Sequence, residues 1–166
     1  MTDTPPPAVP SDVPGDVPSD VPGDVSGAAR RWAIFFETLT PDRLDDLSRH
    51  CHSDIRFKDP FNDVIGIQRV RRVFEHMFET VDRPVFTVTD IAVSDRTAYL
   101  RWHFSFLPKG REGENWTITG VSEVLFDRDL LVVSHLDHWD AGEQFYARLP
   151  LVGWLVRFVR SKLSSA

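Results

Sequence analysis

The sequence predicts an α+β domain in which helices come first and an antiparallel sheet follows. Apolar residues recur at helical spacing between residues 28 and 83, and the chain from Val85 to Trp139 alternates apolar and polar residues as strands do. A single short strand, Ile55 to Lys58, separates the helices. Helices followed by a run of strands are typical of the α+β class.

Length, charge and cysteine content narrow the class of protein. The 166 residues suit one domain with a core. Five of the 25 acids lie in the first 27 residues, which hold no base, so 20 acids face 19 bases in the rest, and no nucleic-acid partner is expected. Cys51 alone excludes an intramolecular disulfide and fits a reducing compartment. Without a signal-peptide pattern or an apolar run long enough to span a membrane, a cytoplasmic location is expected.

Residues 1–27 form a low-complexity leader. SDVPGDVP at 11–18 is followed by SDVPGDVS at 19–26, and seven of the twelve prolines lie in this segment. Such a segment cannot bury enough apolar surface to offset the entropy lost on ordering, so we expect disorder. Whether it is a spacer, a docking tail or a repeat without function stays open. The domain is predicted to cover residues 28–166.

Three helices are expected in the first half of the domain. Ala28 to Leu39 has an apolar face, and Thr40 with Pro41 is typical of an N-cap and first helical position, which predicts a short helix to His50. Gly66 opens a third amphipathic helix that Pro84 is predicted to end.

Four strands are expected in the second half, joined by short polar turns. Their predicted ranges are Val85–Val93, Thr97–Leu107, Trp116–Phe126 and Leu131–Trp139. Consecutive strands with short connections form an antiparallel meander.

This order of elements resembles the NTF2-like superfamily, which includes ketosteroid isomerases and SnoaL-type polyketide cyclases. The resemblance spans Arg30 to Tyr146. Its clearest local match is FKDPF, residues 57–61, followed by Gly66 and a helix, and a weaker match is LDHWD, residues 136–140. It implies a cone in which N-terminal helices wrap a curved, mostly antiparallel sheet, here with an added C-terminal helix. This fold hosts catalysts, ligand binders and interaction modules.

The resemblance implies that Asp59 is a general base at the mouth of the cone. The alternative is that Asp59 only braces the turn into the third helix. Where the isomerases have an oxyanion hole, this chain offers Phe35 and Phe36 on the first helix and Thr119 on the sheet. An efficient steroid isomerase is therefore not expected.

Strand alternation predicts which side chains share the cavity. If Trp139 points inward, as the resemblance implies, His135 and Asp137 do too. The predicted catalytic residues are Asp59, His135 and Asp137, and the predicted ligand-binding residues are Trp102, Phe104, Thr119, Trp139, Phe35 and Phe74. His135 and Asp137 could instead form a purely structural polar network. No cofactor is expected, and no metal site, because metal-ligand spacings of His or Cys are lacking.

The C-terminal segment 151–163 is apolar over most of its circumference and ends in basic residues. It could lie on a membrane surface, or dock on the domain or on a second copy, and docking is the preferred expectation. The sheet face opposite the cavity suits a homodimer. Two functions are thus predicted as alternatives. One is the binding of a small hydrophobic molecule, with acid/base chemistry of the isomerase, cyclase or hydrolase type. The other is a noncatalytic dimeric module that reaches a partner or membrane through its last helix.

Overall fold

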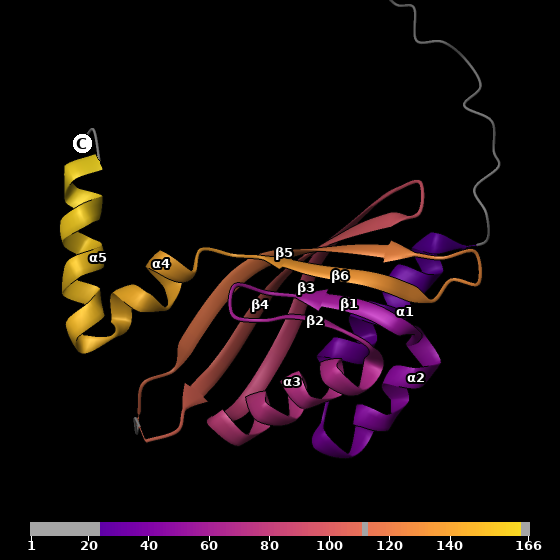
Figure 1. The fold of residues 1–166 in the computed structure, drawn as a ribbon, viewed down its shortest axis with the longest axis horizontal. Helices are drawn as coiled ribbons and strands as arrows, with labels where there is room; N and C mark the ends of the chain where they lie inside the picture. Colours follow the sequence, from indigo (N-terminus) through magenta and orange to yellow (C-terminus); the bar gives the residue numbers. More distant parts are fainter. Residues whose placement is uncertain (1–23, 111–112, 164–166) are drawn as a thin grey trace, which may run out of the picture.

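A mixed six-stranded sheet carries helices on one face (Figure 1). The computed structural model describes residues 24–110 and 113–163, so residues 1–23 of the expected leader lie outside it. The strand order is β2-β1-β6-β5-β4-β3, and only the β1–β6 pair is parallel. This curved, mostly antiparallel sheet confirms the predicted α+β class and cone architecture.

The strands follow the predicted meander with one addition. Their bounds are β1 Cys51–Lys58, β2 Asp63–Ile65, β3 Val81–Ser94, β4 Thr97–Pro108, β5 Trp116–Phe126 and β6 Val132–His138. Strand β2 was not predicted, because the segment between Asp59 and the third helix was expected to form only a turn. Arg56 pairs with Ile65 and also binds Asp63 with two hydrogen bonds, which holds this short edge strand against β1.

Helix α1 spans Val25–Glu37 and supplies much of the core. It begins three residues before the predicted start, because Asp24 caps it by accepting a hydrogen bond from the Gly27 backbone N–H. Trp32 and Phe35 on its inner face are each 1% exposed.

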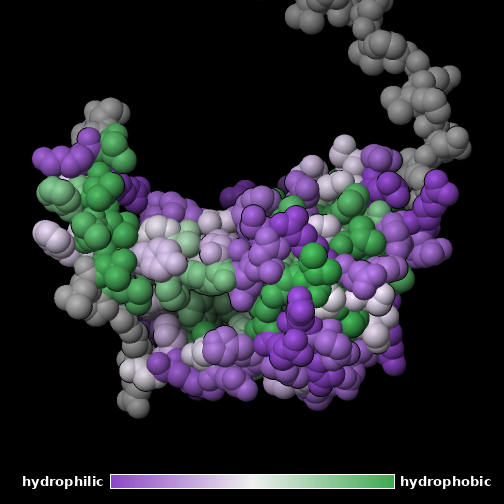
Figure 2. All heavy atoms as spheres, viewed as in Figure 1, coloured by the Kyte–Doolittle hydropathy of each residue, from purple (hydrophilic) through white to green (hydrophobic). Residues whose placement is uncertain are grey.

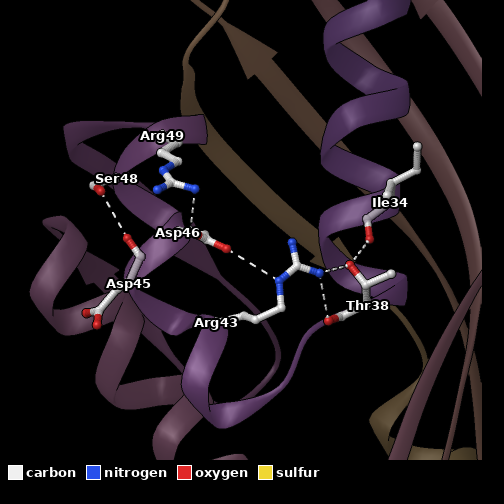
Figure 3. Close-up of polar contacts among 7 residues, drawn as sticks. All are labelled: Ile34, Thr38, Arg43, Asp45, Asp46, Ser48 and Arg49. Carbon is white, nitrogen blue, oxygen red and sulfur yellow. Dashed lines mark hydrogen bonds and ion pairs between the residues drawn. The ribbon is translucent and has the colours of Figure 1, made fainter.

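Arg43 joins the end of α1 to the short helical segment that follows. This segment consists of a 3₁₀ turn, η1 Pro41–Asp46, and α2 Leu47–His50. Figure 3 shows the Arg43 guanidinium between the Thr38 carbonyl oxygen, 3.1 Å away, and Asp46, 3.3 Å away, while Arg49 binds Asp46 from the other side at 2.9 Å. Because these groups are partly solvated, the contacts orient the segment more than they stabilise it.

Helix α3, Ile67–Thr80, covers the open side of the sheet. It follows Gly66, whose φ of 99° lies in a region that favours glycine. The helix ends at Thr80 rather than at Pro84 as predicted. The reason is that Val81 already pairs with Pro108, so the β3 ladder starts before the proline is reached.

The chain after the sheet forms three helical pieces: α4 Ala141–Gln144, η2 Tyr146–Arg148 and α5 Pro150–Leu163. Of these three, α5 was predicted from the sequence, and α4 and η2 were not. Figure 1 shows α5 standing away from the helices that cover the sheet. Among the described residues, no helix is long and apolar enough to cross a membrane.

Candidate functional site

A cavity of about 570 Å³ lies between the helix-covered face of the sheet and α3, with the α4–η2 segment along one side. Figure 2 shows a recessed, largely apolar surface in this region. Its apolar walls come from α1, β1, α3, β3, β4, β5 and the segment that follows β6. They include Phe36, Phe57, Phe74, Met77, Phe86, Leu100, Trp102, Phe104, Phe106, Trp116, Ile118, Trp139, Phe145 and Leu149. The cavity is large enough for a small apolar molecule.

A chain of hydrogen bonds crosses the sheet at the cavity wall. Trp102 Nε1 donates to Ser122 Oγ over 2.8 Å, and Ser122 Oγ donates to Asp137 Oδ1 over 2.5 Å. His135 Nε2 lies 2.9 Å from the same Asp137 oxygen. Ser122 and His135 are each 2% exposed, so these bonds are largely shielded from water.

The indole of Trp32 determines which nitrogen of His135 carries the proton. Trp32 Nε1 donates to His135 Nδ1 over 3.0 Å, so Nδ1 is the acceptor nitrogen. The remaining proton is therefore on Nε2, where it is donated to Asp137. Phe57 stacks on the imidazole with ring centroids 5.2 Å apart, which fixes the plane of the ring. The result is a neutral imidazole held in one orientation.

Asp137 has one oxygen held and one available. Oδ1 accepts from both Ser122 and His135, whereas within residues 24–110 and 113–163 no hydrogen-bond donor reaches Oδ2. The Asp137 side chain is 16% exposed and lines the cavity. A carboxylate in this arrangement can accept a proton or a hydrogen bond from a bound molecule.

Asp59 also lines the cavity, but its oxygens brace the turn after β1. Oδ1 accepts from the backbone N–H groups of Phe61 at 2.7 Å and Asn62 at 2.6 Å, and the Asn62 side-chain amide lies 3.0 Å from both oxygens. The bracing interpretation from the sequence thus has direct geometric support. Lys58 of β1 pairs with Leu136 of the parallel strand β6. The next residues, Asp59 and Asp137, are therefore neighbours, with backbones about 5 Å apart, the usual distance between paired strands.

The six predicted ligand-binding residues fall into two groups. Trp102, Phe104, Trp139 and Phe74 line the cavity; Phe35 and Thr119 do not. Phe35 stacks on Trp32 inside the core, and the next residue, Phe36, reaches the cavity instead. In α1 the cavity is thus lined by Phe36 and not by the predicted Phe35.

Thr119 lies on the opposite sheet face because the alternation along β5 is shifted by one residue from the prediction. It pairs with His103, whose Nδ1 is 3.0 Å from the Thr119 hydroxyl. The residues of β5 that line the cavity are Trp116, Ile118 and Ser122. The alternating apolar set Trp116, Ile118, Val124 and Phe126 was the sequence signal that could have given this register and revealed Ser122.

Gly120 is part of the site although it has no side chain. It pairs with Trp102, and a Cβ at this position would lie 2.5 Å from a carbon of the Trp102 ring. Only glycine therefore lets the indole lie flat across β5 and reach Ser122.

Two other titratable groups lie near the core, outside the cavity. Burial raises the pKa of the Cys51 thiol well above its usual range, so this buried cysteine is a poor nucleophile. Burial also lowers the pKa of His50, whose ring lies against Trp32 and Phe35, and Asp46 opposes this effect. In the part of the chain that the structure describes, no group of three His, Cys, Asp or Glu residues could hold a metal ion.

Among the side chains of α5 that the structure describes, none lines the cavity, and the helix exposes its own apolar face. Gly153 packs close to the Ala147 carbonyl, and the two arginines of the helix bind Ala147 and Glu143 of the preceding segment. Its apolar residues face outward, with Trp154 66% and Leu155 53% exposed (Figure 2). The polar side of α5 therefore contacts the α4–η2 segment and the apolar side faces solvent, the reverse of an ordinary surface helix.

Comparison with known proteins agrees with this architecture. The family model for the SnoaL-like domain matches residues 32–135. No curated protein matched the chain.

Several solved structures share the fold. An NTF2-like protein from Exiguobacterium sp. 255-15 is 17% identical, with a TM-score of 0.59 over 68% of this chain and 98% of that one. A protein with a ketosteroid isomerase-like fold from Catenulispora acidiphila, solved with trimethylamine, is 14% identical, with a TM-score of 0.62 over 80% and 97% of the two chains. An LEH-like epoxide hydrolase from M. tuberculosis is 13% identical, with a TM-score of 0.59 over 86% and 94%. The chain belongs to the SnoaL-like domain family, within the NTF2-like superfamily.

Proposed function

We propose that this domain binds a small apolar molecule in its cavity and transfers a proton on that molecule, with Asp137 as the base. The observation that supports this most strongly is the asymmetric hydrogen bonding of the Asp137 carboxylate. Oδ1 is fixed by His135 and Ser122, and Oδ2 is left for the ligand. A base held in one orientation beside an apolar cavity is suited to accept a proton from a positioned substrate.

The proton comes from a carbon next to a carbonyl group in a reaction of the isomerase or cyclase type. The C–H bond breaks, its electron pair forms the enolate, and the proton moves to Asp137 Oδ2. The protonated carboxyl then returns the proton to a different atom of the substrate. In a hydrolase, the same oxygen would instead take a proton from a water molecule as the water oxygen attacks an epoxide carbon. The C–O bond of the ring at that carbon breaks, and the protonated carboxyl gives its proton to the released alkoxide oxygen, which yields a diol.

His135 and Ser122 are positioning residues in this proposal. Both donate to Oδ1, so they hold the carboxylate plane and act on the reaction through Asp137. Trp32 and Trp102 hold His135 and Ser122 in turn.

Asp59, which the family resemblance implies as the base, is the competing candidate. Both its oxygens already accept hydrogen bonds from the turn, which favours Asp137. The two carboxylates are matched controls for each other, since both line the same cavity and both can be changed to the amide.

The test is exchange of the α protons of a panel of cyclic ketones in D₂O, followed by NMR, with hydrolysis of small epoxides measured in parallel. We expect Asp137→Asn to lower the rate by about 100-fold or more, the usual contribution of a general base, and Asp59→Asn to retain most of the activity. Ligand binding, followed by tryptophan fluorescence, should survive in both variants.

Two results would contradict the proposal. Loss of activity in Asp59→Asn alone would make Asp59 the base. Binding without turnover across both panels would leave a ligand-binding protein without catalysis.

The exposed apolar face of α5 favours a second candidate, the noncatalytic dimeric module. Val152, Leu155 and Val159 lie on one exposed side of the helix, and its charged residues are all basic. The open cavity argues against this candidate as the whole function, because a pure interaction module has no need of one. Sedimentation of the full chain, alone and with anionic vesicles, compared with Leu155→Glu, tests whether α5 forms a dimer or contacts a lipid surface.

A further inference from the structure

A second hollow, of about 350 Å³, lies beside the mouth of the main cavity. Its lining consists of Asn62, Val64, Arg69, Arg72, Val73 and His76. Asn62, Val73 and His76 line the main cavity as well, so the two hollows share a wall. Within the part of the chain that the structure describes, no carboxylate lines the second hollow.

Arg69 and Arg72 give this hollow a positive charge. Together with His76 they occupy one stripe of α3, at spacings of three and four residues. Among the described residues, neither arginine has an ion pair or a side-chain hydrogen bond, whereas Arg71 on the same helix binds Asp45 and Glu75. His76 is 3.7 Å from Glu79. Two guanidinium groups are therefore available to a ligand at the rim.

The main cavity has the opposite polarity. Its ionisable acids are Asp59 and Asp137, and the rest of its wall is mostly aromatic and aliphatic. A negatively charged group would be repelled inside the cavity and attracted at the rim, while an apolar group would be favoured inside. Guanidinium groups bind carboxylates with paired hydrogen bonds.

We propose that the ligand is an amphipathic acid: an apolar body fills the main cavity while a carboxylate is bound by Arg69 and Arg72 at the rim. This inference rests on the proposed function, because it requires the cavity to bind a ligand. The same polarity orients the ligand, since the reverse orientation would bring its carboxylate beside Asp137. The atoms next to Asp137 are then those of the apolar body, away from the carboxylate.

The test uses two ligands of nearly equal size, 4-cyclohexylbutanoate and its uncharged amide, titrated into the full chain. Neither absorbs where tryptophan does, and Trp102, Trp116 and Trp139 line the cavity, so tryptophan fluorescence measures binding. We expect the acid to bind about fivefold more tightly than the amide at low salt, with a preference that decreases as salt is added. The double variant Arg69→Gln/Arg72→Gln should bind both equally, with its affinity for the amide unchanged.

Arg96→Gln/Arg128→Gln is the matched control. It removes the same charge at turns whose residues line neither hollow, and it should keep the preference for the acid. Equal binding of acid and amide by the unchanged protein, or an equal loss of preference in both double variants, would overturn the inference. Failure of both ligands to bind would contradict the proposed function instead, and an unchanged affinity for the amide shows that the variants are folded.

Discussion

Gly120→Ala is the most direct perturbation of the hydrogen-bonded chain, because the structure gives the distances from the added methyl group to the atoms around it. The added Cβ would lie 2.5 Å and 2.6 Å from two carbons of the Trp102 ring and 3.0 Å from the His138 carbonyl oxygen. These distances are too short for carbon atoms in contact, so the indole has to move. Its Nε1 would then lose the 2.8 Å hydrogen bond to Ser122.

The expected loss of stability combines three effects. Overpacking a well-packed site costs about 1 to 3 kcal/mol, and a lost hydrogen bond costs about 1 kcal/mol. The reduced entropy of the unfolded chain returns about 0.4 to 1 kcal/mol. We therefore expect the free energy of unfolding to fall by about 2 kcal/mol, which lowers the melting temperature by several degrees for a chain of this size.

Urea unfolding measures the change, and the Trp102 indole N–H resonance reports whether the ring has moved. Trp102→Phe completes a double-mutant cycle with Gly120→Ala, because a phenyl ring lacks the indole carbons that the new methyl group would meet. Gly120→Ala should therefore cost less in the Trp102→Phe background than alone. Additive costs, or an unchanged indole resonance with wild-type stability, would refute the steric reasoning.

Three further predictions concern the stability of the protein and involve residues in or beside the buried core. Trp32→Phe keeps the ring but leaves His135 Nδ1 buried without its donor, so urea unfolding should show a loss of about 1 to 3 kcal/mol, whereas equal stability would mean that water replaces the indole. The raised pKa of Cys51 means that the unfolded chain loses its thiol proton first, near the usual value of 9, so stability should fall as the pH rises above about 9, and Cys51→Ala should flatten that fall. The lowered pKa of His50 means that the unfolded chain binds its proton first, so stability should fall as the pH drops below about 6.5; a slope unchanged in His50→Gln would assign the effect to other groups.

The sequence predicted the order of elements and most strand bounds because alternation and helical spacing are local signals. The β5 strand matches its predicted bounds, Trp116–Phe126. Thr80 shows where local signals fail, because the pairing of Val81 with Pro108 ends α3 before Pro84 does. Edge strand β2 likewise could not be predicted from the sequence, because three residues show no periodicity and the strand depends on its pairing with β1.

The candidate site was predictable in its residue types and less so in its register. His135, Asp137 and Trp139 follow from one alternation on β6, and all three line the cavity. Thr119 was assigned from the family resemblance, and the apolar alternation of its own strand would have placed it on the other face. Ser122 was missed for the same reason. The bond from Trp32 to His135 joins residues 103 positions apart, which no local pattern can predict.

The hydrogen-bonded chain in the cavity wall favours catalysis over the binding of an apolar molecule alone. Buried polar groups contribute little net stability compared with apolar groups of the same shape, but a fully bonded network fixes orientation. Here four donors form two branches, from Trp32 through His135 and from Trp102 through Ser122. Both branches end on a single oxygen, Asp137 Oδ1. A role limited to packing would be served equally well if the donors were spread over both oxygens. Fixing one oxygen and leaving the other to the cavity defines the direction from which a ligand atom can approach, and direction matters far more for proton transfer than for apolar binding. If Asp137→Asn, which retains one acceptor oxygen, leaves ligand affinity unchanged while abolishing exchange, the network serves to orient a base.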